Sequence, residues 1–281
     1  MDTGENLSLC LTVCLSRLYD RKSFHLTSST PTLTSSQDVA RGFIFPFRVK
    51  ESALKGLFIH TDDTTDAHTT GLGLAMLVQY SSSPAGPYDE LLYALPCRRP
   101  TMGFQLMATR RIPAIFVSTQ ASVVNGRLNW GVPKNLARFQ WRVDPGYLYS
   151  TTTVTVSSND DTAITTTTIL PPVRIFTLNI PIFVHIGLLR WACPLFMQRH
   201  LDVDGRELSG GGAGELWHAY KLGGCGWARL CIATGGDDSA SGSGLCPSLA
   251  SLGAWAGIEL RGSLVMPAPD TFRAAQRSAV D

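Results

Sequence analysis

One lysine in an apolar setting is the first candidate for chemistry. The chain of 281 residues has 19 arginines but only five lysines, and one of these, Lys134, stands in the stretch NGRLNWGVPKNLARF (125–139). Its neighbours Trp130, Val132 and Leu136 are apolar. A free lysine amine has a pKa of about 10.4 and is charged at pH 7, but desolvation disfavours the charged form. A desolvated amine could therefore attack a ketone or aldehyde and form a Schiff base.

A structural role accounts for the same lysine. Its aliphatic stem could lie on apolar surface while the ammonium group stays in water. The preceding Pro133 restricts the local backbone, which would help to hold the direction of the amine in either case. Spacing alone favours the structural role over the catalytic one.

Other kinds of catalytic site lack their motifs. The glycine-rich stretches match neither G-x-G-x-x-G nor G-x-x-x-x-G-K-[ST], and no G-x-S-x-G stretch is present. The six histidines do not form an H-E-x-x-H pattern, and the seven cysteines contain no C-x-x-C pair. The protonated imine that a lysine forms with a carbonyl compound is itself an electron acceptor. No metal and no organic cofactor is therefore expected.

Composition limits the partners and the location. The net charge is +2, and no window combines dense Lys/Arg clusters with aromatics, so nucleic acid is not an expected partner. Residues 175–197 are strongly apolar, but Asn179, Pro181, His185 and Arg190 interrupt them. This pattern predicts a buried strand followed by a short helix rather than a stable membrane span. Scattered, unpaired cysteines are typical of reduced thiols, and we expect a cytoplasmic protein.

The elements that would position Lys134 are mainly strands. Short apolar or alternating runs at 73–80, 90–95, 110–118, 227–234 and 256–266 are separated by Gly-, Pro- and Ser-rich turns. The Thr-rich segment 147–170 predicts a hairpin, because threonine's branched carbon favours the pleated backbone. Asn125–Gly126 tolerates positive φ and predicts a turn just before the lysine.

These patterns predict a mainly β fold, a curved antiparallel sheet or barrel, in one domain spanning residues 43–281. Residues 1–42 contain a Ser/Thr-rich tract that cannot bury much surface. We expect them to form a loose or atypical N-terminal arm.

Two longer stretches resemble a known family. QYSSSPAGPYDELLY (79–93), followed by NGRLNWGVPKNLARFQW (125–141), is similar to the acetoacetate decarboxylase-like superfamily, in particular its fungal branch. The resemblance implies a β cone or barrel around an apolar pocket, and Lys134 falls at the position of the Schiff-base lysine. It also implies a small keto acid or ketone as partner and, because family members often oligomerise, a homo-oligomer.

The chain departs from the decarboxylase pattern at three places. Asn135 stands where the decarboxylases have a second lysine, and Ser82 where they have a glutamate. The N-terminal part that helps to close the pocket is not recognisable, so an expected arginine there has only Arg41 and Arg48 as candidates. Asp89 or Glu90 could supply the missing carboxylate, although a salt bridge or a turn is the favoured explanation for each of them.

The resulting hypothesis is a lyase-type enzyme with Lys134 as nucleophile and Asp89 or Glu90 as charge partner. Candidate substrate-binding residues are Ser82, Tyr80, Trp130, Asn135 and Arg127. Decarboxylation of a β-keto acid is the family default, and aldol or dehydration chemistry through the same imine stays open. By analogy with the fungal relatives, the reaction would belong to secondary metabolism. The alternative is a non-catalytic β-barrel protein that binds a small molecule and has lost the decarboxylase partners.

Overall fold

The computed structural model describes residues 35–49, 71–97, 109–146, 149–158, 173–184, 195–206, 216–234, 249 and 252–273. They belong to a unit that spans Thr34–Asp281. The first strand of this unit begins at Ser35, so the domain boundary expected after residue 42 falls inside a strand. The remainder of the expected arm, residues 1–34, lies outside the described residues.

The described elements are twelve strands and one helix. In chain order they are β1 (Ser35–Val49), β2 (Gly71–Ser82), β3 (Tyr88–Pro96), β4 (Thr109–Val117), α3 (Gln120–Trp130), β5 (Lys134–Asp144), β6 (Tyr149–Ser158), β7 (Val173–Val184), β8 (Leu195–Arg199), β9 (Leu216–Tyr220), β10 (Gly223–Thr234), β11 (Ala256–Met266) and β12 (Asp270–Arg273). The mainly β fold predicted from the sequence is confirmed, including all five of the apolar or alternating runs named above.

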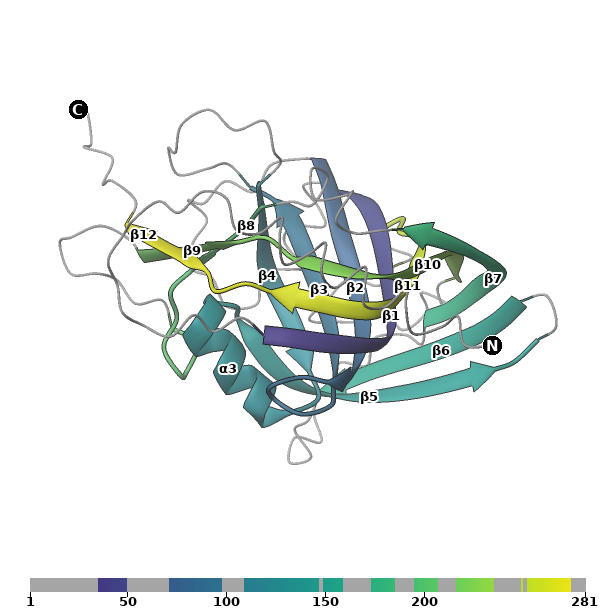
Figure 1. Cartoon of the computed structure of the whole chain (residues 1–281), viewed down its shortest axis with the longest axis horizontal. Helices are drawn as coiled ribbons and strands as arrows, with labels where there is room; N and C mark the ends of the chain where they lie inside the picture. Colours follow the sequence, from purple (N-terminus) through teal and green to yellow (C-terminus); the bar gives the residue numbers. More distant parts are fainter. Residues whose placement is uncertain are drawn as a thin grey trace, which may run out of the picture. The chain divides into compact units, whose positions relative to one another are not determined.

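The strands close into a barrel. Their order in the sheet is β12-β9-β8-β4-β3-β2-β1-β11-β10-β7-β6-β5, and β5 also pairs with β4. This last pairing is parallel, with Ile115 opposite Lys134, and it joins the two ends of the curved sheet. The strands β8, β9 and β12 continue from β4 as an extension outside the closed ring. Figure 1 shows the curved strands of the barrel, with α3 beside β5.

Successive side chains of β2, β3 and β4 point to opposite faces of the sheet, and most of them are buried. The sheet therefore separates two hydrophobic cores. The inner core fills the barrel and includes Phe43, Phe45, Leu77, Leu91, Tyr93, Ala137, Val156 and Ile175. The outer core lies on the opposite face of β1 to β4. It includes Val39, Met76, Val78, Tyr80, Tyr88, Leu92, Ile115, Val123, Trp130, Phe196, Tyr220 and Leu264. Helix α3 and strands β8 and β9 therefore cover the outer face of the sheet, where Lys134 also points.

A bulge in β1 exchanges the faces of its side chains. The register shifts between Val39 and Arg41, where Val39 pairs with Tyr80 and Arg41 pairs with Gln79. One extra residue in a strand reverses the direction of every side chain that follows it. Val39 accordingly joins the outer core, whereas Arg41 turns toward the barrel interior.

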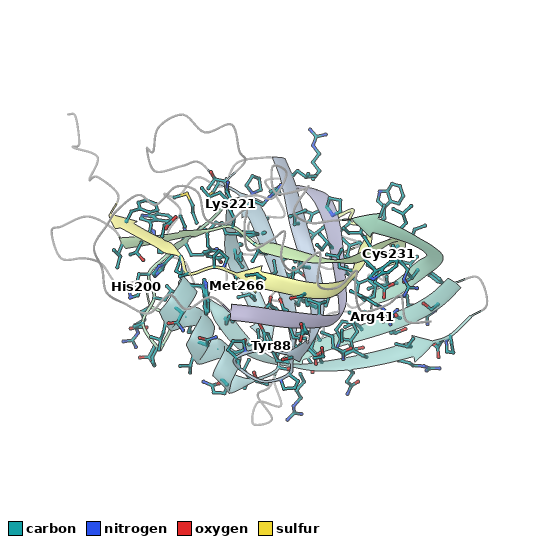
Figure 2. The ribbon with its side chains drawn as sticks, in the orientation of Figure 1. Arg41, Tyr88, His200, Lys221, Cys231 and Met266 are labelled. Carbon is teal, nitrogen blue, oxygen red and sulfur yellow. The ribbon has the colours of Figure 1, made fainter. Side chains whose placement is uncertain are left out.

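A carboxylate buried in the inner core has arginines beside it. The side chain of Glu259 is 1% exposed, and its Oε1 lies 2.8 Å from Nε of Arg41. Nε of Arg229 lies 3.6 Å from Oε2 of the same carboxylate. Arg41 and Cys231 project at the same end of the barrel (Figure 2), and burial raises the pKa of the Cys231 thiol to about 12, with a further contribution from Glu259. Neither Cys231 nor Cys97 is in a disulfide bond.

The expected turn at Asn125–Gly126 is wrong, because both residues lie inside α3. The helix begins after Thr119, whose side chain accepts a hydrogen bond from the backbone N–H of Ser122, and ends at Gly131 with φ of 62°. Thr119 and Gly131 are the capping residues that mark the two ends of this helix, and the dipeptide alone does not indicate them.

Several other expectations fall partly on residues that the structure does not describe. The first arm of the predicted hairpin is β6, but the second arm lies at 159–170, outside the described residues. Residues 173–184 form a strand as expected, whereas the short helix expected after it lies at 185–194, also outside them. No helix in the described segments has the length and apolar character needed to cross a membrane.

Candidate active site

Lys134 is the first residue of β5, three residues after the glycine that ends α3. The N–H of Gly131 donates to the carbonyl of Arg127, and the N–H of Val132 donates to the carbonyl of Gly126. The chain therefore leaves the helix through a tight, hydrogen-bonded turn and enters β5 directly. This connection places Lys134 on the outer core side of the sheet, with 8% of its surface exposed.

The amine of Lys134 is held by three side chains. Nζ lies 2.8 Å from Oε2 of Glu90 and 3.0 Å from Oγ of Ser122. It also lies 5.1 Å from the centre of the Tyr88 ring, within the range of a cation–π interaction. Glu90 and Ser122 are themselves buried, so the ion pair is almost closed to solvent. A buried, paired lysine of this kind is the arrangement expected of a site, and a snorkelling lysine would instead expose its ammonium group.

Tyrosines surround the carboxylate of Glu90. The hydroxyls of Tyr80 and Tyr88 each donate toward it over 3.4 Å, and their rings lie 4.7 Å apart. Burial raises the pKa of both tyrosines well above its usual value, and the charge of Glu90 raises it further. The same two causes raise the pKa of Tyr220. All three phenols therefore stay protonated near neutral pH and can act as hydrogen-bond donors.

The site extends to β1 through Tyr88. Its hydroxyl oxygen also lies 3.3 Å from Oε1 of Gln37, an alternative acceptor for the same proton, and Figure 2 labels this tyrosine near β1. Gln37 precedes the bulge at residue 40 and is therefore turned toward the outer face. Without the extra residue, the side chains of Gln37 and Arg41 would point to the same face of the sheet.

A glycine inside α3 provides room for the lysine stem. A Cβ on Gly126 would lie 2.5 Å from Cδ and 2.7 Å from Cε of Lys134. Glycine within a helix costs about 0.5–1 kcal/mol relative to alanine. Close packing of the lysine against the helix explains why this position is glycine.

Arg127 and Asn135 hold the backbone around the lysine rather than its amine. Nε of Arg127 donates to the carbonyl of Lys134 over 3.0 Å, and Nη1 donates to the carbonyl of Val203. Asn135 receives a 3.5 Å hydrogen bond from Arg127 and donates to the carbonyl of Pro133. Because alternate residues of a strand face opposite sides, the side chain of Asn135 points away from the Lys134 amine.

The remaining predicted residues lie in different surroundings. Glu90 contacts the amine, whereas the adjacent Asp89 faces the other side of β3, where burial raises its pKa. Ser82 is exposed at the end of β2. Trp130 is buried in the outer core, and its Nε1 donates to the carbonyl of Pro267 over 3.4 Å. The structure thus brings Lys134, Glu90 and Tyr80 together, and it places Asp89, Ser82 and Asn135 elsewhere.

Ser122, Gln37 and Tyr220 belong to the surroundings of the amine but were not predicted from the sequence. Ser122 lies on α3, between the strand expected at 110–118 and the turn expected at Asn125–Gly126, and Gln37 lies within the arm expected at 1–42. Tyr220 is 86 positions after Lys134 in the chain, too far for a local motif to indicate it. The spacing of Ser122 and Gly126, one helical turn apart, was the available signal for the helix face that meets the lysine. Among the residues described, no three His, Cys, Asp or Glu side chains are grouped as a metal site would require.

A histidine pair supports the turn that precedes Lys134. Nδ1 of His200 lies 2.6 Å from Nε2 of His218, and Nδ1 of His218 lies 3.2 Å from Oγ1 of Thr271. A Cβ on Gly131 would lie 3.1 Å from Cδ2 of His218 and 2.0 Å from the carbonyl oxygen of Arg199. Gly131 thus needs both its positive φ and its lack of a side chain to sit against β8 and β9.

Acid should weaken the fold through this pair. Burial, followed by the proximity of His200, lowers the pKa of His218 from 6.5 to about 4. Between these values the unfolded chain binds the proton and the folded chain does not, so stability is retained above about 6.5 and lost as the pH falls toward about 4. We expect the free energy of unfolding to fall by up to about 1.4 kcal/mol per pH unit in this window. Urea unfolding of the wild type and His218→Gln measures it, and an equal slope in the variant would contradict the assignment.

Residues 30–176, just over half of the chain, match the family described as acetoacetate decarboxylase (ADC). The chain belongs to this family, as the two motifs predicted. No curated protein sequence gives a significant match to the chain.

Solved structures share the fold at low sequence identity. An acetoacetate decarboxylase from Legionella pneumophila is 13% identical with a TM-score of 0.56, covering 94% of this chain and 96% of that one. A structure described as an acetoacetate decarboxylase is 12% identical with a TM-score of 0.58, covering 93% and 99%. An acetoacetate decarboxylase-like enzyme from Sphingomonas wittichii RW1 is 12% identical with a TM-score of 0.52, covering 90% and 99%. These likenesses support the curved β fold.

Proposed function

We propose that the protein is a lyase that binds a keto substrate as a Schiff base on Lys134, with Glu90 as its proton partner. The observation that carries this proposal is the contact between Nζ of Lys134 and Oε2 of Glu90, at 2.8 Å, inside a nearly closed site. A carboxylate at this distance can accept the ammonium proton and so free the amine for attack. Membership of the decarboxylase family supports the same role.

The steps balance around these two groups. The neutral amine adds to the substrate carbonyl, and protonated Glu90 returns its proton to the carbinolamine oxygen, which leaves as water. The resulting iminium ion accepts the electron pair of the C–COO⁻ bond, so CO2 leaves and an enamine remains. Protonation of the enamine carbon and addition of water then release the ketone and the lysine. Ser122 and the neutral tyrosine hydroxyls can hydrogen-bond the carbinolamine and direct the proton.

Decarboxylation of a β-keto acid is the reaction we place first. The substrate carboxylate would enter a site that already holds the carboxylate of Glu90, and repulsion between like charges favours departure as CO2. The enamine could instead attack an aldehyde, so aldol or dehydration chemistry is the second candidate. Asn135, in place of a second lysine, and Ser82, in place of a glutamate, are the departures that keep this candidate open.

Reductive trapping tests the proposal. The purified protein is mixed with small ketones and keto acids, reduced with borohydride, digested and analysed by mass spectrometry. We expect an adduct on Lys134 near neutral pH and none on Lys221, which serves as the internal comparison. Equal labelling of all lysines, or none of Lys134, would argue for the non-catalytic binding protein instead. Release of CO2 from a β-keto acid, measured in parallel, separates decarboxylation from aldol chemistry.

Four broader expectations remain predictions from the motif resemblance and composition. They are a place in the fungal branch, a role in secondary metabolism, assembly into homo-oligomers and a cytoplasmic location. Analytical ultracentrifugation of the purified chain would test the oligomeric state directly.

A further inference from the structure

The hydroxyl of Tyr220 is a buried hydrogen-bonding group without a partner in the described part of the chain. Tyr220 is the last residue of β9, and 4% of its surface is exposed. Its hydroxyl oxygen is closed to solvent, and none of the residues that the structure describes forms a hydrogen bond with it. A buried polar group in this state costs free energy, so native proteins rarely keep one without a reason. Action on a bound ligand is one such reason.

Strand β9 directs Tyr220 toward the Lys134 site. Two residues earlier on the same strand, the ring of His218 lies against Gly131, in the turn that leads into Lys134. Side chains alternate along a strand, so His218 and Tyr220 project from the same face of β9. The ring of Tyr220 stacks on Phe196 of β8, with the ring centres 5.6 Å apart and the planes at 13°. This stack holds the direction of the ring inside the outer core.

Tyr220 differs from the other two tyrosines whose pKa is raised by the charge of Glu90. The hydroxyls of Tyr80 and Tyr88 each donate toward this carboxylate over 3.4 Å. Tyr220 makes no hydrogen bond with the carboxylate, although burial and then the charge of Glu90 raise the pKa of its phenol. Its proton is therefore held firmly but is not committed to Glu90. Of the three phenols, Tyr220 has the proton that can be donated to a new acceptor.

The substrate oxygen that must approach Glu90 is the oxygen of the carbonyl group. In the mechanism proposed above, Glu90 returns its proton to the carbinolamine oxygen, so these two groups must meet. Addition of the amine places negative charge on that oxygen, and a buried donor that is already in position stabilises such charge. A substrate carboxylate, by contrast, is repelled by the charge of Glu90. The carbonyl oxygen is therefore the acceptor that the surroundings of Glu90 favour.

We propose that Tyr220 is a further catalytic residue, whose hydroxyl donates a hydrogen bond to the carbonyl oxygen of the substrate as Lys134 adds to it. The phenol keeps its proton throughout, and the proton that completes the carbinolamine still comes from Glu90. The hydroxyl then gains a partner only when substrate is present, so the interaction lowers the barrier and does not stabilise the free protein. This inference rests on the Schiff-base role proposed above, and it adds the residue that activates the carbonyl.

Tyr220→Phe, which removes only the hydroxyl, tests the inference in the intact chain. The adduct on Lys134 is followed over time with acetone and with pyruvate, with cyanoborohydride in excess so that imine formation limits the rate. The variant should trap both compounds more slowly by about 10-fold or more. The factor should be the same for each compound, because both present a carbonyl oxygen. Tyr220→Met also lacks the hydroxyl and should be at least as slow, in case the first variant does not fold.

Tyr93→Phe is the matched control for trapping. Tyr93 is a buried tyrosine of the inner core, on the opposite face of β3 from Glu90. Its hydroxyl cannot reach the amine, so this variant should form the adduct on Lys134 at the wild-type rate.

Stability is an independent measurement of the same hydroxyl. Tyr220→Phe removes a polar atom that has no partner, so its midpoint of urea unfolding should equal or exceed that of the wild type. Tyr80→Phe loses a hydrogen bond to Glu90 and should have a lower midpoint. A lower midpoint in Tyr220→Phe would mean that the hydroxyl has a partner in the free protein, and it would overturn the inference.

Two trapping results would also overturn it. The first is a wild-type rate in Tyr220→Phe for both compounds. The second is a loss confined to pyruvate, which would assign the hydroxyl to the substrate carboxylate. Failure of the proposed function has a different signature, since the wild type itself would then give no adduct on Lys134 with any carbonyl compound, and the inference would fall with it.

Discussion

Replacing Lys134 by methionine should abolish the reductively trapped adduct and turnover together. Methionine has a similar length and would fill the space that the lysine stem occupies beside Gly126, but it has no amine to attack a carbonyl. It also leaves Glu90 buried without its cation. Removing one partner of a buried ion pair costs about 3–5 kcal/mol, so we expect an unfolding free energy lower by an amount of that order. Peptide mapping and urea unfolding measure the two effects separately.

The double variant Lys134→Met, Glu90→Gln is the control for the stability effect. Glutamine keeps the shape of the glutamate and removes its charge, so the double variant should regain part of the stability lost by Lys134→Met. Lys221→Met should keep the adduct on Lys134. A trapped adduct elsewhere in Lys134→Met, with turnover intact, would show that another amine does the chemistry.

Replacing Gly126 by alanine should lower the rate of trapping by about 100-fold or more. The added methyl group would lie 2.5 Å from Cδ of Lys134, and the flexible lysine stem must move away. A displacement of about 1 Å at a reacting group can cost about 100-fold in rate. The amine would lose its present distances of 2.8 Å and 3.0 Å to Glu90 and Ser122. Stopped reactions followed by mass spectrometry give the rate.

The stability of Gly126→Ala identifies the cause of the loss. Alanine is favoured over glycine in a helix by about 0.8–1 kcal/mol, so α3 itself should be no less stable. Leu128→Ala, at an exposed position of the same helix, should leave the rate unchanged. Trapping at the wild-type rate in Gly126→Ala would mean that the close contact does not position the amine.

Local patterns in the sequence were sufficient for most strands of the barrel. The runs at 73–80 and 90–95 became β2 and β3 because their apolar residues are buried on both faces, as in the centre of a sheet. The motif with Lys134, through its resemblance to the decarboxylase family, also indicated the nucleophile that is proposed above. Glu90 and Asp89 could not be distinguished, since strand alternation separates them only when it is known which face of β3 lies on the same side of the sheet as the Lys134 amine.

The missing parts of the site depend on long-range packing. Gln37 reaches Tyr88 because one extra residue in β1 changes the direction of its side chains, and no local pattern marked that bulge. Ser122 reaches the amine because α3 packs beside β5, whereas Asn125–Gly126 suggested a turn. A glycine required for packing and a glycine required for a turn look the same in the sequence.

The contact between Arg41 and Glu259 joins residues 218 positions apart, and β1 pairs with β11 along the same seam. During synthesis, at about 5–20 residues per second, β1 leaves the ribosome on the order of 10–40 s before its partner exists. Throughout that interval one edge of β1 has unsatisfied N–H and C=O groups, which can pair with other chains. The barrel therefore closes only after β11 has been made, and until then that edge of β1 is open to pairing with other chains.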